Sequence, residues 1–311
     1  MRVLFFGTPQ IAVPFLDWLE KHTTVAGVIC RPDQPVGRGY EVTEPPTKVF
    51  ANSKNIPVFQ PAGPWTDDFV ETLKKTESDI GIVVAYGRIL PEKIFLTPKL
   101  GCINIHFSLL PQYRGAAPMQ WSLIKGEKKT GVSAFWLEQG LDSGPLCAQI
   151  STSLENEYLP ELREKLTQIG VQVLEKLIDQ LNKGQIVKTL QEGVVSLAPQ
   201  LKKEDGRINW DKPAQDIVNL IRGVCEWPGA STTYLWGGIP KQLKIFKAIA
   251  EDTHHSNMKP GLIVQADKNG IVVQTSQGRI CLIQVQPEGK KPMDAWAFWQ
   301  GARLKKGDQL G

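Results

Sequence analysis

The stretch Gly101–Pro118, GCINIHFSLLPQYRGAAP, decides the fold of the first half of the chain. Its first residues, Gly101–Ile105, form a predicted strand, and a loop rich in Pro, Gly and Ser follows directly. An earlier run, Asp79–Ala85 (DIGIVVA), is apolar at consecutive positions. Strands that are apolar on both faces are typical of a parallel sheet that helices cover on both sides.

The segments before this stretch alternate between strand and helix patterns. Strands are predicted at Arg2–Gly7 and Val25–Cys30, and helices at Ile11–Leu19, Thr47–Lys54 and Asp67–Lys75. This alternation predicts an α/β domain with a Rossmann-like, mostly parallel sheet. Open sheets of this class bind ligands at the carboxyl ends of their strands.

The pattern changes after Thr130. Two strands, Gly131–Leu137 and Leu146–Ser153, precede a long predicted helix, Pro160–Leu181. Beyond a stretch of little periodicity, a short helix near Pro213–Arg222 is followed by alternating strands at Ala230–Leu235, Gln242–Ala248, Leu262–Gln265, Ile271–Thr275 and Ile280–Val285. Several short strands at this spacing predict a small β-barrel. We therefore predict a first domain at residues 1–188, a linker at 189–206 and a second domain at 207–311.

The composition limits the class of protein. The chain has 311 residues, of which 41% are hydrophobic and 22% charged, as in globular proteins. No apolar run approaches the roughly 18–20 residues of a membrane span, and the first residues read as a strand, so we expect a cytoplasmic protein without a membrane partner. Five scattered cysteines and four histidines disfavour a disulfide framework or a metal site.

The charge differs between the two predicted domains. Residues 1–206 carry 22 basic and 23 acidic side chains, a net charge of −1, whereas residues 207–311 carry 14 and 9, a net charge of +5. The two values sum to the +4 of the whole chain. A basic second domain favours an anionic partner, although ordinary surface charge remains an alternative.

The candidate site lies where the Gly101–Ile105 strand ends. Asn104 and His106 are two residues apart, so in an extended strand they point to the same face. Asp142 lies in a second polar turn, Glu138–Pro145 (EQGLDSGP), and would raise the pKa of His106 as its partner. In the alternative interpretation these residues only bond loop backbone, and Asp142 only forms a turn.

Together the three residues suit acyl transfer to an amine. An oxyanion develops on the carbonyl oxygen during attack, and an asparagine amide and a protonated histidine can both donate to it. A His–Asp pair can also move the protons that the attacking nitrogen loses and the leaving nitrogen gains. The chain has no GxSxG elbow and no cysteine paired with a histidine, so no covalent nucleophile is expected.

The pattern Asn104-x-His106, then Ser108-Leu109-Leu110-Pro111, with Asp142 downstream, resembles the signature of enzymes that use 10-formyltetrahydrofolate as formyl donor. Along nearly the whole chain the sequence is similar to the methionyl-tRNA formyltransferase family, in FFGTP, RPDQPVGRG, VVAYGRILP, RGAAPMQ, GLDSGP, KEDGRINW and QPEGKKPM. The resemblance implies formyl transfer from 10-formyltetrahydrofolate to the α-amine of methionyl-initiator tRNA. It also implies an OB-like barrel as the second domain.

The resemblance assigns roles to residues of this chain. Asn104, His106 and Asp142 would be catalytic, and Arg38 would contact tRNA. The folate would lie against Val84, Tyr86, Gly87, Ile89, Leu90, Ser108, Leu109, Leu110, Pro111, Gly140 and Leu141. The candidates for tRNA contacts in the second domain, chosen by charge, are Lys244, Lys247, Lys290, Lys291 and Arg303. The reaction needs no metal, and one acceptor per chain requires only a monomer.

Three other interpretations of the sequence stay open. The same chemistry could serve a sugar nucleotide, glycinamide ribotide or water as acceptor, although a hydrolase would leave the basic second domain unexplained. A nicotinamide-dependent oxidoreductase should carry GxGxxG after the first strand, and Gly7-Thr8-Pro9-Gln10 lacks it. An RNA-binding module without activity would leave Asn104, His106 and Asp142 without a role.

Overall fold

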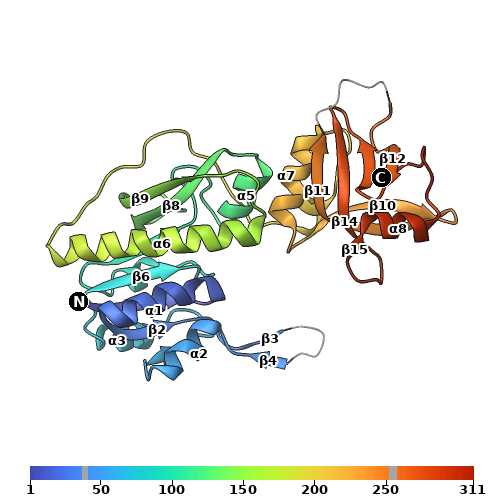
Figure 1. The fold of residues 1–311 in the computed structure, drawn as a ribbon. Helices are drawn as coiled ribbons and strands as arrows, with labels where there is room; N and C mark the ends of the chain where they lie inside the picture. The colour runs from blue at the N-terminus through green and yellow to red at the C-terminus, as the bar shows by residue number, and fades with distance from the viewer. Residues whose placement is uncertain (37–40, 252–257) are drawn as a thin grey trace. The chain divides into compact units, whose positions relative to one another are not determined.

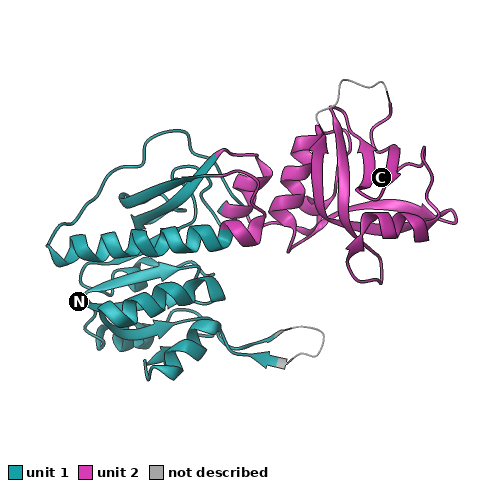
Figure 2. Ribbon diagram, in the orientation of Figure 1, with its two compact units in different colours: residues 1–118, 129–153, 163–199 teal, residues 119–128, 154–162, 200–311 magenta. Residues whose placement is uncertain are grey.

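Two sheets organise the chain in the computed structural model, which describes residues 1–36, 41–251 and 258–311 (Figure 1). The chain divides into two units (Figure 2). Unit 1 comprises Met1–Pro118, Lys129–Ser153 and Arg163–Pro199. Unit 2 comprises Met119–Lys128, Leu154–Leu162 and Gln200–Gly311. Residues 189–199 of the predicted linker therefore lie within unit 1.

Unit 1 contains a seven-stranded sheet in the order β5-β2-β1-β6-β7-β8-β9. Its strands are β1 (Arg2–Gly7), β2 (Thr24–Ile29), β5 (Val58–Phe59), β6 (Ile80–Val84), β7 (Cys102–His106), β8 (Lys129–Trp136) and β9 (Leu146–Ser153). The pairings from β5 to β7 are parallel, and β8 pairs antiparallel with both β7 and β9. The expected mostly parallel, Rossmann-like sheet is confirmed.

Helices cover both faces of this sheet, as the apolar strands require. All five residues of β6 are buried. On one face, Leu4 and Phe6 of β1 share a core cluster with Val70 and Leu73 of helix α3 (Asp67–Lys74). On the other face, Gly170 of helix α6 (Leu159–Asn182) lies close to Phe15 of helix α1 (Val13–His22), and an added Cβ would be 2.6 Å from the ring. A glycine at this position lets the two helices pack closely.

The helices of unit 1 follow the predicted segments with small shifts. They are α1 (Val13–His22), α2 (Pro46–Ser53), α3 (Asp67–Lys74), α4 (Glu92–Phe95) and α6 (Leu159–Asn182), whose first residues belong to unit 2. The sequence analysis did not predict α4, α5 (Pro118–Ile124) or the β3–β4 pair (Gln34–Val36 and Glu41–Thr43). These elements are three to seven residues long, too short for a clear periodic pattern.

Unit 2 contains an antiparallel sheet in the order β10-β11-β14-β13-β12, with β15 paired to β14. Its elements are α7 (Ala214–Val224), β10 (Ala230–Trp236), β11 (Ile239–Glu251), β12 (Ile263–Asp267), β13 (Gly270–Gln274), β14 (Arg279–Pro287), β15 (Met293–Asp294) and α8 (Ala295–Ala302). The expected β-strand domain after the linker is confirmed as an antiparallel sheet.

The end of the chain joins the two outer strands of this second sheet. The amide of Gly311 donates to the carbonyl of Thr233 on β10, and the amide of Leu310 donates to Gly261, just before β12. The amide of Ile263 on β12 donates to Asp308. Residues 308–311 thus pair with backbone groups at the two edges of the sheet that water would otherwise solvate. Edges covered in this way are typical of a small barrel.

The topology determines where a ligand can meet the chain in unit 1. β6 and β7 are parallel neighbours, with Val84 opposite Ile105. The segment after β6 and the SLLP loop after β7 therefore begin at the same edge of the sheet. This edge holds the carboxyl ends of the strands, where the polar residues of the sequence pattern lie.

Candidate active site

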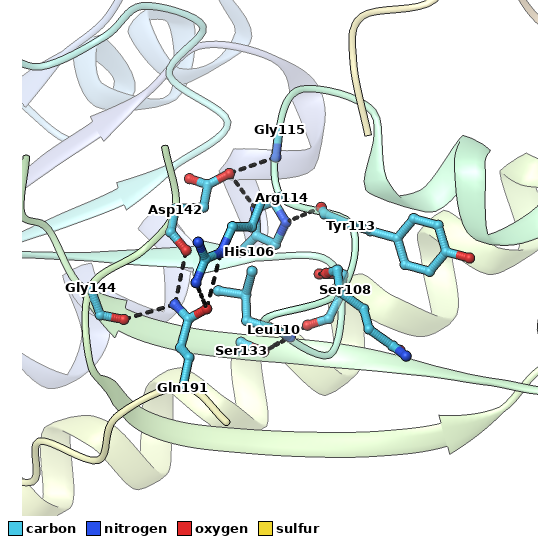
Figure 3. Close-up of polar contacts among 11 residues, drawn as sticks. His106, Ser108, Leu110, Tyr113, Arg114, Gly115, Ser133, Asp142, Gly144 and Gln191 are labelled. Atoms are coloured by element: carbon cyan, nitrogen blue, oxygen red, sulfur yellow. Dashed lines mark hydrogen bonds and ion pairs between the residues drawn. The ribbon is translucent and has the colours of Figure 1, made fainter. Parts of the chain in front are cut away.

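His106 ends β7 and is almost completely buried, with 5% of its surface exposed. Its Nε2 atom lies 2.9 Å from the carbonyl oxygen of Tyr113 (Figure 3). Its ring is nearly perpendicular to the ring of Phe135, with the two centroids 6.4 Å apart. Because a carbonyl oxygen only accepts hydrogen bonds, Nε2 carries the hydrogen. The neutral ring therefore presents an unprotonated Nδ1. Burial lowers the pKa of His106 and outweighs Asp142 and the Tyr113 carbonyl, which both raise it.

Asp142 points toward this free nitrogen from the turn between β8 and β9. Its Oδ2 atom is 3.7 Å from Nδ1 of His106, and it accepts a 2.7 Å hydrogen bond from the amide of Gly115 (Figure 3). The backbone of Asp142 has a φ of 47°, in the left-handed region. The structure thus brings together the two residues whose contact the sequence left undecided.

Asn104 lies two residues before His106 on β7 and is half-buried. Its register partners are Val83 on β6 and Phe135 on β8. Its side-chain amide forms no hydrogen bond with any residue that the structure describes. This amide is therefore free to donate to a ligand at the edge of the sheet.

A buried serine fixes the SLLP loop beside these residues. Ser133 of β8 donates to the carbonyl of Ser108 at 2.7 Å and accepts from the amide of Leu110 at 3.1 Å (Figure 3). Gln149 of β9 donates to the Ser133 hydroxyl and to the Leu110 carbonyl. Ser108 itself donates to the carbonyl of Gln112. These bonds give the loop one conformation.

Residues 187–198 form hydrogen bonds with the loop after β7 and with the Asp142 turn, and none of them was predicted from the sequence as a site residue. Ser196 accepts from the amide of Tyr113 through its hydroxyl and from the amide of Arg114 through its carbonyl. Gln191 donates to the carbonyls of Asp142 and Gly144 and accepts from the guanidinium of Arg114 (Figure 3). These residues carry no periodicity or motif, so nothing in the sequence marks them.

Gly144 shows how tightly the Asp142 turn is built. A Cβ at this position would lie 1.9 Å from the carbonyl oxygen of Trp136. Trp136 in turn donates through its indole nitrogen to the carbonyl of Val187. The turn, the end of β8 and the segment after α6 are therefore packed against one another, and only glycine fits at residue 144.

The residues expected to bind folate occupy two different environments. Val84, Tyr86, Leu90, Ser108, Leu110 and Pro111 are buried, Leu109 is half-buried, and Gly87 and Gly140 are exposed. Ile89 and Leu141 are 88% and 56% exposed. Gln139 donates to Glu92 at 2.7 Å, which links the Asp142 turn to the segment after β6. The exposed apolar side chains of Ile89 and Leu141 therefore lie on two segments that are joined by the Gln139–Glu92 hydrogen bond.

The expected tRNA contacts remain predictions. Arg38 lies outside the described residues. Lys244 and Lys247 lie on β11, where their register partners on β14 are Gln286 and Gln284. Lys290 and Lys291 lie in the turn after β14, and Gln286 donates to the Lys290 carbonyl. Arg303 follows α8. Four of the five basic residues in unit 2 therefore lie around one strand pair.

Among the described residues, no group of three or more His, Cys, Asp or Glu side chains could hold a metal ion. Within those same ranges, no helix is both long and apolar enough to cross a membrane. The cysteines are free, and four of the five are buried.

The geometry defines what this arrangement can do. A free amide donor and an unprotonated ring nitrogen backed by a carboxylate lie at the carboxyl end of β7. Such a set can bind a carbonyl oxygen, accept a proton from an attacking group and stabilise the resulting imidazolium. It contains no serine or cysteine nucleophile activated by His106, since the ring nitrogens face Tyr113 and Asp142.

Comparisons with known proteins agree with this chemistry. A family model described as "Formyl transferase" matches residues 1–178, and one described as "Formyl transferase, C-terminal domain" matches residues 200–303. The chain is 42% identical to the methionyl-tRNA formyltransferase of Pelotomaculum thermopropionicum, over 100% of this chain and 99% of that protein.

Two solved structures share the fold at low identity. One is an N-formyltransferase from Helicobacter canadensis in complex with folinic acid and dTDP-3-aminofucose, with a TM-score of 0.67 and 17% identity, covering 92% of this chain and 98% of that one. The other is a methionyl-tRNA formyltransferase from Clostridium thermocellum, with a TM-score of 0.54 and 19% identity, covering 82% and 95%. The fold is thus common to enzymes with different acceptors.

Proposed function

The chain belongs to the formyl transferase family, and we propose that it transfers the formyl group of 10-formyltetrahydrofolate to the α-amine of methionyl-initiator tRNA for translation initiation. The observation that carries the chemistry is the free Nδ1 atom of His106, 3.7 Å from the Asp142 carboxylate at the end of β7. The similarity to a methionyl-tRNA formyltransferase over the whole chain favours this acceptor.

The transfer follows from the roles of the three residues. The amine attacks the formyl carbon, a new N–C bond forms, and negative charge develops on the formyl oxygen. Asn104 donates to that oxygen through its free side-chain amide. A donor of this kind typically contributes about 3–4 kcal/mol of barrier lowering. The bond between the formyl carbon and the folate nitrogen then breaks, which releases tetrahydrofolate and formylmethionyl-tRNA.

The protons balance through His106. The attacking amine loses one proton, which Nδ1 of His106 accepts. The imidazolium formed lies between the Asp142 carboxylate and the Tyr113 carbonyl, which both favour its charge. The folate nitrogen that leaves then takes this proton. General acid–base catalysis of this kind is typically worth about 10²–10⁴-fold in rate.

The folate co-substrate would lie against the segments that meet beside His106. Exposed Ile89 and Leu141 offer apolar contact to its rings. The side chains of Val84, Tyr86 and Leu90 are already buried in the protein core, so they would shape this surface from beneath.

The tRNA would be held by both predicted domains. Arg38 would reach the acceptor end, since a guanidinium fork suits phosphate and base edges. The basic residues around β11 and β14, with Arg303, would follow the backbone of the tRNA. We assign residues 1–188 to catalysis and 207–311 to tRNA binding, and we propose a monomer that works in the cytoplasm.

One assay separates this function from the alternatives. The protein is incubated with 10-formyltetrahydrofolate and either charged initiator tRNA, charged elongator tRNA, an amino sugar nucleotide or no acceptor. We expect formylation of the charged initiator tRNA above all others. Formylation of the sugar nucleotide alone, or release of formate without an acceptor, would contradict the proposed acceptor.

A further inference from the structure

Gln191 lies in the segment after α6, where no sequence pattern marks a functional residue. We propose that Gln191 is a positioning residue of the formyl transfer, because its side-chain amide holds Asp142 in place beside His106. This inference rests on the proposed function and deepens it. It concerns a residue outside the trio Asn104, His106 and Asp142.

Every hydrogen-bonding position of the Gln191 amide is used within the site. The Nε2 atom donates to the carbonyls of Asp142 and Gly144, each at 2.8 Å (Figure 3). The Oε1 atom accepts from Nη2 of Arg114 at 2.7 Å and from Nε at 3.2 Å. An amide has two donor hydrogens and two acceptor lone pairs, so these four bonds satisfy it completely. The side chain has no capacity left for another role.

The Asp142 turn needs such an anchor. Asp142 has a φ of 47° and Gly140 a φ of 120°, so two residues of this short turn are left-handed. Residues other than glycine rarely adopt this conformation, and it persists only where neighbouring contacts impose it. Gln191 holds this turn through its hydrogen bonds to the carbonyls of Asp142 and Gly144. The direction of the carboxylate toward Nδ1 depends on the backbone that these bonds fix.

The same glutamine also reaches the other side of the histidine. Arg114 directly follows Tyr113, whose carbonyl accepts from Nε2 of His106. The backbone of Arg114 is held by Ser196 at 2.9 Å and by Ala198 at 2.7 Å. Gln191 therefore connects the two segments that contact the two nitrogens of the imidazole ring. A change in Gln191 would disturb Asp142 directly and Tyr113 through Arg114.

The test uses two substitutions of Gln191 and a neighbour as control. Gln191→Met keeps the length and neutrality of the side chain but removes all four bonds. Gln191→Glu keeps an acceptor for Arg114 but lacks both donors to the turn. Glu192→Gln changes the next residue, which is exposed. The turnover number kcat and the KM for each substrate are measured for full-length proteins, alone and combined with Asp142→Ala.

We expect Gln191→Met to lower kcat about 10- to 100-fold, because displacement of a reacting group by about an ångström has effects of this size. The KM values should stay within about twofold, and Glu192→Gln should match the wild type. Gln191→Glu should lose as much as Gln191→Met, and it carries the test if Gln191→Met does not fold. When Gln191→Met is added to Asp142→Ala, kcat should fall by less than about twofold further. The reason is that both substitutions remove the same function, the Asp142 carboxylate beside His106.

Three results would overturn the positioning role. The first is a wild-type kcat in Gln191→Met, and the second is a kcat close to the wild-type value in Gln191→Glu. The third is a kcat in the double variant that falls by the product of the two single losses.

A second readout does not depend on the acceptor. His106 is titrated by nuclear magnetic resonance and assigned through His106→Asn. Its pKa should fall in Gln191→Met as the carboxylate withdraws, and an unchanged pKa contradicts the inference even if the wild type proves not to formylate tRNA.

Discussion

The Nε2 atom of His106 lies 2.9 Å from the carbonyl oxygen of Tyr113, so Nδ1 is the ring nitrogen that remains for chemistry. The Tyr113 backbone thereby selects the tautomer of the histidine, as second partners of a reacting imidazole generally do. Asp142 faces the other nitrogen at 3.7 Å, a separation that leaves the neutral ring without a hydrogen bond there. When Nδ1 gains a proton, the Asp142 carboxylate is therefore in place to stabilise the imidazolium.

Replacement of His106 should abolish most of the activity. We expect His106→Ala to lower kcat by about 10²- to 10⁴-fold, because the group that accepts the proton of the amine and returns it to the leaving folate nitrogen is lost. The matched control is His22→Ala, since His22 is an exposed histidine on α1. Turnover is measured with saturating charged tRNA and formyl donor, and thermal unfolding checks the fold. A near-normal kcat in a folded His106→Ala protein would remove this residue from the mechanism.

The buried histidine should make the stability depend on pH. Burial lowers the pKa of His106 in the folded protein below its ordinary value of 6.5. Below pH 6.5 the unfolded chain therefore binds a proton that the folded protein does not, and stability falls as the pH decreases. The slope contributed by this residue is at most about 1.4 kcal/mol per pH unit. Urea unfolding between pH 7 and pH 5 measures it, and the slope should be smaller in His106→Asn than in the wild type.

The hydroxyl of Ser133 should stabilise the SLLP loop. In Ser133→Ala the Ser108 carbonyl and the Leu110 amide lose their partner, and buried groups left unpaired cost about 1–3 kcal/mol each. We expect a lower free energy of unfolding and a higher Kd for the folate. Ser151→Ala serves as control, because Ser151 is an exposed serine on β9. If Ser133→Ala binds folate as the wild type does, the loop does not depend on this serine.

Arg38 should serve the tRNA and not the folate. We expect Arg38→Ala to lower kcat/KM for charged initiator tRNA and to leave the Kd of the folate unchanged, because in the proposed function the guanidinium fork would contact the acceptor. The dependence of tRNA binding on salt should also weaken by about one phosphate contact. Lys75→Ala, at the exposed end of α3, removes the same charge elsewhere. An equal loss of folate binding would place Arg38 in the other subsite.

The fold could largely be predicted because its signals are local. Asp79–Ala85 is apolar along its whole length, and the structure places Ile80–Val84 in the centre of a covered parallel sheet. The elements that escaped prediction, such as the Gln34–Val36 and Glu41–Thr43 pair, are too short for periodicity to show. Residues 189–199 were expected in a linker because they have no periodicity, although their hydrogen bonds attach them to unit 1.

The sequence by itself determined which residues could react. Asn104 and His106 share a face because a strand has a period of two, and Asp142 belongs to a turn that its glycines permit. Only the tertiary structure decided that Asp142 faces Nδ1, that Tyr113 occupies Nε2 and that Gln191 holds the turn. These contacts join residues 7 to 49 positions apart, and no local rule of side-chain spacing reaches across such distances.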